Sequence, residues 1–162
     1  MKTKLLSIIA LGLSVSLLMT GCGKTLTYGI LERDSALTGG NLSFVYDENT
    51  HTATFGGEGE VVAYYPAELE LGRSAGNRIG VKIYAPSEVT DYSKAKLNFE
   101  GSEYVGGSFM TMVYDQVQNY FVLTPIVSEN HRELKVYVTW LQDSEQQTYT
   151  IKIADGTKFA SA

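Results

Sequence analysis

The sequence contains little cysteine, histidine or proline. Among 162 residues there are one Cys, two His and three Pro. A single thiol excludes an intramolecular disulfide, and structural zinc sites need several thiolate or imidazole ligands. The folded body must therefore be stabilised by the burial of its apolar side chains, which make up much of a chain that is 44% hydrophobic.

The chain also lacks recognisable catalytic and metal-binding frames. His51 and His131 are the only imidazoles, and neither has a second histidine at ligand spacing, so we expect no metal site and no cofactor and interpret both as turn or surface residues. The glycine-rich stretch around Ser108 lacks the Gly-x-Ser-x-Gly frame of a nucleophile elbow. We do not expect an enzyme. Glutamates are numerous, however, so a small hydrolase that uses paired carboxylates stays as a minor alternative.

Positive charge is scarce. The chain has 13 Lys and Arg against 18 Asp and Glu. Phosphate binding depends on clustered basic side chains, so nucleic acid is not expected as a partner.

The N-terminus combines a short basic start with an apolar run that is too short to span a membrane. Lys2 and Lys4 precede the run from Leu5 to Met19, which has about 15 residues where a spanning helix needs about 20. A basic start followed by such a run is typical of an export signal. The run ends in Leu18-Met19-Thr20-Gly21-Cys22.

This ending resembles the lipobox of bacterial lipoproteins, although Met19 stands where leucine is most common. The resemblance implies a signal helix over residues 1–21, followed by lipidation of Cys22, which would then be the mature N-terminus. Several acyl chains hold a protein firmly on a bilayer. We therefore expect an exported protein whose partner is the outer face of a bacterial membrane in the cell envelope, with Cys22 as its anchor. Residues 22–40 are expected to form a tether, and an edge strand over Leu26 to Leu31 is the alternative.

Residues 41–162 show short β-rich runs separated by turn signals. Asp47-Glu48-Asn49-Thr50 predicts a hairpin turn between Leu42–Tyr46 and Thr52–Phe55. About eight strands with regular turns and no amphipathic helix predict an all-β fold, an antiparallel two-sheet sandwich. The pair of segments 136–140 and 149–153 resembles the last two strands of bacterial immunoglobulin-like surface modules. Alternate residues of a strand lie on the same face, and the apolar residues of both segments alternate in this way. We therefore predict that one core holds Val136, Val138, Trp140, Ile151 and Ile153.

Tyrosine is the residue in surplus, with 11 in the chain. Tyr84 and Tyr137 fall on the face opposite the aliphatic residues of their strands, and Tyr64 and Tyr65 directly precede Pro66. Tyrosine combines flat apolar area with a polar tip, and it is also simply a good strand residue. We predict these four as ligand contacts of a non-catalytic binding or adhesion module for an envelope or extracellular protein or glycan. A structural lipoprotein of an envelope complex is the second hypothesis.

Overall fold

The computed structural model describes residues 23–36, 38, 42–66, 75–91, 94–101, 111–114 and 119–162. The predicted signal segment 1–21 and Cys22 lie outside these residues. The described part of the chain is all-β, as predicted, and contains no helix. None of its elements is therefore a helix that could cross a membrane.

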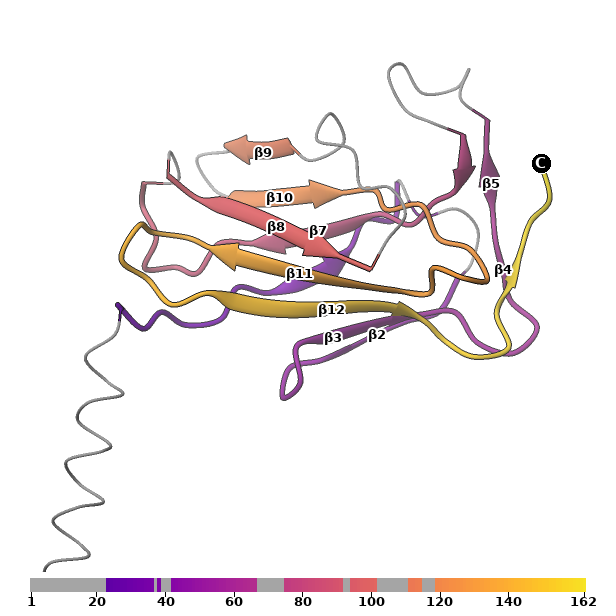
Figure 1. The fold of residues 1–162 in the computed structure, drawn as a ribbon, viewed down its shortest axis with the longest axis horizontal. Coiled ribbons are helices and arrows are strands. Elements are labelled where there is room, and N and C mark those ends of the chain that lie inside the picture. Colours follow the sequence, from indigo (N-terminus) through magenta and orange to yellow (C-terminus); the bar gives the residue numbers. More distant parts are fainter. Residues whose placement is uncertain are drawn as a thin grey trace, which may run out of the picture.

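Two main sheets make up the body (Figure 1). The four-stranded sheet has the order β1 (Leu31–Arg33), β7 (Val81–Tyr84), β10 (Asn119–Leu123) and β9 (Thr111–Tyr114). The five-stranded sheet has the order β2 (Phe44–Asp47), β3 (Thr52–Phe55), β12 (Gln147–Ile153), β11 (Glu133–Thr139) and β8 (Lys96–Glu100). Two small pairs complete the described strands: β4 (Val61–Val62) with β13 (Lys158–Phe159), and β5 (Tyr64–Tyr65) with β6 (Gly76–Asn77).

Both main sheets contribute apolar side chains to a single core. Alternate residues of β7, β10, β11 and β12 are buried, because a strand turns successive side chains to opposite faces. The rings of Phe121 from β10 and Trp140, which directly follows β11, lie 5.4 Å apart between centroids. The predicted core is confirmed, since all five of its members are at most 4% exposed: Val136, Val138, Trp140, Ile151 and Ile153.

The predicted hairpin is confirmed, but the prediction of a purely antiparallel arrangement is wrong. Strands β2 and β3 pair antiparallel around the turn at 48–51, whereas β3 pairs with β12 in parallel. Further along, β4 also pairs in parallel with β13. The segment from Thr52 to Val62 thus runs beside the C-terminal strands in the same direction. Alternation in a sequence predicts a strand and its buried face, and it carries no information about the direction of a distant partner.

The segment that follows Cys22 is attached to the body from its first described residues. The backbone of Lys24 bonds to Asp143 through its N–H, and the Glu145 N–H donates to the Lys24 carbonyl over 3.0 Å. After this bridge, β1 joins the edge of the four-stranded sheet beside β7. An edge strand does form within residues 22–40, but it lies at Leu31–Arg33 and not over Leu26 to Leu31, which is outside any strand up to residue 30. The expected tether is wrong for residues 24–33, because backbone pairing holds both ends of this stretch.

Candidate functional site

The four predicted tyrosines lie in three different sheets. Tyr64 and Tyr65 form β5, Tyr84 ends β7 and Tyr137 lies in the middle of β11. Tyr84 and Tyr137 follow the buried Ile83 and Val136, so both point away from the shared core, each from its own sheet. The structure therefore does not gather the four tyrosines into one row.

Tyr84 contributes to a small aromatic patch on the four-stranded sheet. It lies opposite Tyr120 on β10, with ring centroids 5.1 Å apart in an edge-to-face arrangement. The ammonium of Lys82 lies 5.0 Å from the Tyr120 ring centroid, within the range of a cation–π contact. Burial, followed by the nearby Glu32 carboxylate, raises the pKa of the Tyr84 hydroxyl. The contacts of Tyr84 and Lys82 thus converge on the Tyr120 ring.

Tyr137 belongs to a larger polar surface, which we call the outer face: the side of the five-stranded sheet that is turned away from the core. The Tyr137 hydroxyl donates to Oε1 of Glu100 over 2.7 Å, and this bond raises the pKa of the phenol. Strand register aligns the polar residues of the outer face in rows across the strands. One row runs through all five strands as Asp47, Thr52, Thr150, Lys135 and Glu100.

Opposite charges alternate across the outer face. Lys135 is directly opposite Glu100 on β8, and Glu133 is directly opposite Lys152 on β12. Threonines occupy most of the remaining positions, and Tyr137 is the only aromatic residue on this side of the described strands. Cross-strand pairs of opposite charge stabilise a sheet modestly, by about 0.2–1 kcal/mol each. Exposed at a flat face, they also form a fixed pattern of charge that a partner can complement.

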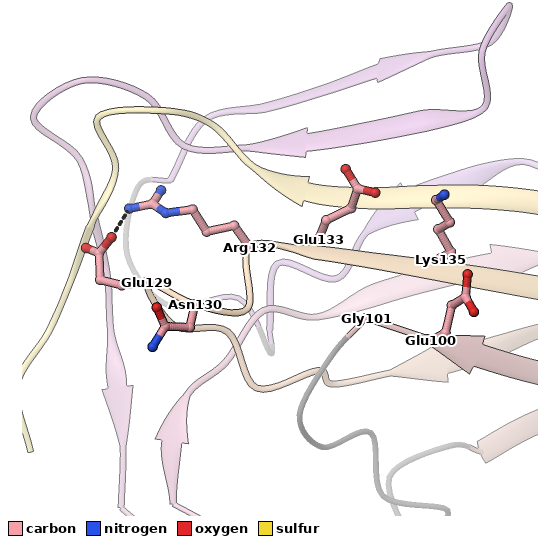
Figure 2. A pocket seen from close by; sticks show the side chains of 7 residues that line it. All are labelled: Glu100, Gly101, Glu129, Asn130, Arg132, Glu133 and Lys135. Atoms are coloured by element: carbon pink, nitrogen blue, oxygen red, sulfur yellow. Dashed lines mark hydrogen bonds and ion pairs between the residues drawn. The ribbon is translucent and has the colours of Figure 1, made fainter.

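At one end of the outer face the surface is hollowed into a charged groove of about 460 Å³. Figure 2 shows it at the start of β11, with side chains from the turn before β11 on one side and from β8 and β11 on the other. Its described lining consists of Glu100, Gly101, Glu129, Asn130, Arg132, Glu133 and Lys135.

Arg132 stabilises the wall of the groove through several contacts of its guanidinium group. Its Nη2 bonds to Oε2 of Glu129 over 2.6 Å and to the Thr157 carbonyl over 3.1 Å, while Nη1 donates to the Ala154 carbonyl over 3.2 Å. The guanidinium also lies 4.9 Å from the centroid of the Phe159 ring. This side chain therefore ties the turn before β11 to the C-terminal segment. Lys135, the other cation of the described lining, is an exposed residue.

The groove contains three carboxylates, which bears on the hydrolase alternative. Glu129 is bound by Arg132, and Glu100 accepts the Tyr137 hydrogen bond. Glu100, Glu129 and Glu133 are all exposed. A general acid in glycoside hydrolysis needs a desolvated carboxyl group that stays protonated near neutral pH. The exposed carboxylates of this groove are better suited to binding than to proton transfer.

The two histidines lie in turns, as predicted, and far from each other in the sequence. His51 is the last residue of the β2–β3 turn and has a positive φ of 51°, and the Nδ1 of His131 lies 3.1 Å from the Ser128 hydroxyl. Ser128 and His131 also exchange backbone hydrogen bonds across a four-residue turn, which accounts for the side-chain contact. Among the described residues there is no group of three or more metal-binding side chains.

The residue that sequence reasoning missed is Gln147. Its side chain is buried at 3% exposure and contacts a core tryptophan and the N-terminal segment. A signal was present, because Gln147 shares the parity of Tyr149, Ile151 and Ile153 and therefore places an amide on the core face of β12. A polar residue at a core position is normally fixed by several hydrogen bonds.

No protein-family model matches the chain, and no curated protein or solved structure matches it either. The geometry of the described residues is therefore the basis for a functional proposal.

Proposed function

We propose that the protein is an exported bacterial lipoprotein, held on the outer face of an envelope membrane by acyl chains on Cys22, whose body is an immunoglobulin-like two-sheet sandwich that binds a partner without catalysis. The lipobox resemblance supports the anchor. The common core of the two main sheets supports the sandwich architecture.

The outer face with its groove is the proposed binding surface, and a protein of the envelope or its surroundings is the proposed partner. The observation that carries this choice is the alternation of exposed acids and lysines in strand register, around Tyr137. Fixed charges of both signs select a partner with the complementary pattern and disfavour others. A glycan is the alternative partner, since Tyr137 and the carboxylates also suit hydroxyl groups. The described strands of this face offer a sugar ring one aromatic platform, Tyr137.

The position of the docked N-terminal segment supports this assignment. Lys24, two residues after Cys22, pairs with the turn that follows β11, whereas the groove lies where β11 begins. Seven strand residues separate the two ends by about 20 Å. Figure 1 shows the first described residues at one end of the body and β13, near the C-terminus, at the other end. An anchor on Cys22 would leave the groove turned away from the bilayer.

The test is a binding screen of the full chain, in a polyoxyethylene detergent, against envelope proteins and glycans. Lys135→Glu and Tyr137→Ala alter the outer face, and Tyr84→Ala alters the four-stranded sheet as a matched control. We expect the first two variants to weaken binding about tenfold or more, which corresponds to about 1.4 kcal/mol. Tyr84→Ala should leave binding unchanged. Urea unfolding of each variant separates lost contacts from lost folding.

Other outcomes of the screen favour the alternatives. Binding that survives both outer-face variants contradicts the proposed surface. A body that binds nothing in the screen supports a structural role in an envelope complex. Turnover of a glycoside that is lost in both Glu100→Gln and Glu133→Gln would contradict a non-catalytic function and support the hydrolase.

A further inference from the structure

A second hollow lies between the N-terminal segment and the β2–β3 hairpin. Its volume is about 320 Å³, which is at the lower end of the range for small-molecule sites. It is separate from the outer face, because Tyr46 has the parity of Phe44 and points to the core side of β2. We call it the aromatic pocket, and its described lining consists of Thr27, Tyr28, Gly29, Ile30, Tyr46, Glu48 and His51.

Aromatic rings form the walls and hold one another in place. The rings of Tyr28 and His51 are stacked in parallel, with centroids 3.4 Å apart and planes 1° from parallel. Tyr149 meets the Tyr28 ring edge-on at 5.6 Å, and the Tyr28 hydroxyl accepts a hydrogen bond from the Thr148 N–H over 3.3 Å. The Tyr46 hydroxyl lies 3.4 Å from Nδ1 of His51. Such rings are ordered before a ligand arrives, which lowers the entropic cost of binding.

The charge of the aromatic pocket is negative. Glu48 lines it, Asp47 is adjacent in the hairpin, and the described lining contains no lysine or arginine. Burial, with a further contribution from the Glu48 carboxylate, raises the pKa of Tyr46 to about 12. Burial also lowers the pKa of His51, which disfavours a compensating positive charge on this imidazole.

We propose that the aromatic pocket binds an organic ammonium group, of which choline is a quaternary example. Tyrosine ring faces attract such cations through their quadrupole, and a carboxylate at the rim supplies the opposite charge. A sugar would need several converging hydrogen-bonding groups. The pocket offers few, since Tyr46 and Tyr28 already have partners and the Thr27 hydroxyl is bound by Glu88. This proposal is independent of the proposed lipid anchor and of the outer face.

The experiment is a choline titration of the full chain in a polyoxyethylene detergent, followed by the NMR signals of the histidine ring protons. The chain has only two histidines, so His51 reports on the pocket and His131 serves as an internal control. The neutral isostere 3,3-dimethylbutan-1-ol tests the need for charge. Glucose tests the sugar alternative, and monomeric short-chain phosphatidylcholine distinguishes a lipid headgroup from a free solute as the source of the ammonium.

We expect saturable shifts of His51 with choline, unchanged His131 signals, and no saturation with the neutral alcohol. Glu48→Gln should weaken choline binding about fivefold or more, and Tyr28→Leu should abolish it. The matched control Glu58→Gln removes a charge from an exposed turn elsewhere and should have no effect. Phosphatidylcholine that binds more tightly than choline would identify a lipid source, and weaker binding would identify a solute. Equal shifts of both histidines, saturation by the alcohol or by glucose, or no saturation by choline would each overturn the proposal.

Discussion

The indole Nε1 of Trp140 donates a hydrogen bond to Oε1 of Gln147 over 3.1 Å, between two buried side chains. The Gly29 N–H donates to the same oxygen over 3.1 Å, and the Tyr149 hydroxyl lies 2.9 Å from it. The Gln147 amide nitrogen donates to the Thr27 carbonyl over 2.8 Å. One buried amide thus joins the core tryptophan to the N-terminal segment.

We predict that Gln147→Leu strongly destabilises the protein. The change leaves the Trp140 indole and the Gly29 N–H without their acceptor inside the body, and each unsatisfied buried group costs about 1–3 kcal/mol. The free energy of unfolding from urea titrations should fall by about 2–6 kcal/mol, the sum for the two groups. Gln146→Leu is the matched control, because Gln146 is exposed and adjacent in sequence. Equal stability of the two variants would contradict a central role for the Gln147 amide.

We predict a loss of about 3–5 kcal/mol for Trp140→Ala, the range typical of large-to-small changes at buried aromatic positions. Trp140 is fully buried and packs on Phe121. A domain of this size is stable by about 5–15 kcal/mol, so the melting temperature should drop markedly. Trp140→Phe keeps most of the volume and should cost less. An unchanged melting temperature for Trp140→Ala would place the indole at the surface.

Strand positions and core residues were predictable from this sequence because they depend on local alternation. Val136, Val138 and Trp140 share one parity along β11 and the residue that follows it, and all three are buried. The pairing of β3 with β12 was not predictable in the same way. Nearly 100 residues of sequence separate these two strands, and nothing in either indicates whether a distant partner runs parallel or antiparallel.

The candidate sites were less predictable, because they depend on which strands become neighbours. The alternation of residues along each strand correctly placed Tyr84 and Tyr137 away from the core. It could not show that the two strands belong to different sheets. The stacking of Tyr28 on His51 joins a segment expected to be a tether to a hairpin turn. Only the docking of that segment creates the aromatic pocket.

We predict that stability decreases between about pH 10, where an exposed tyrosine in the unfolded chain ionises, and pH 12. Burial raises the pKa of Tyr46 to about 12 in the folded state, and burial also raises the pKa of Tyr149. The unfolded chain then loses protons at a lower pH than the folded protein, so stability is fully present below pH 10 and falls as the pH rises. Urea unfolding at pH 8, 10 and 11 measures the slope. Tyr46→Phe should make it shallower, and an unchanged slope would contradict the assignment.

We predict that Cys22→Ser abolishes lipidation and either releases the protein from the membrane fraction or leaves it stranded there without lipid. The prediction rests on the proposed lipoprotein function and on the absence of any other cysteine from the chain. Metabolic labelling with a radioactive fatty acid and membrane fractionation measure the two effects. Ser144→Ala, which leaves Cys22 intact, is a control that should remain labelled. Label on the Cys22→Ser variant would show that the acyl chains are attached elsewhere.

If Cys22 carries the lipid, the docked segment should also fix the orientation of the body on the membrane. Only Gly23 separates Cys22 from Lys24, whose backbone is bonded to Asp143 and Glu145. The turn after β11 should therefore lie near the bilayer and the groove about 20 Å farther out. The native thiol is consumed by the lipid, so Gln142→Cys and Asn130→Cys each add one free thiol for a fluorophore, at exposed positions near the turn and at the groove.

A nitroxide on the lipid headgroups should quench the label at position 142 more strongly than the label at position 130. This difference in quenching depends on the short connection between Cys22 and Lys24. A flexible insertion of about ten Gly and Ser residues after Gly23 should therefore reduce the difference, because such a chain reaches about 15–20 Å. Both labelled variants must retain the urea midpoint of the unlabelled protein for the comparison to hold. Equal quenching at the two positions without the insertion would contradict a fixed orientation, because a body free to tumble on its anchor would expose both ends alike.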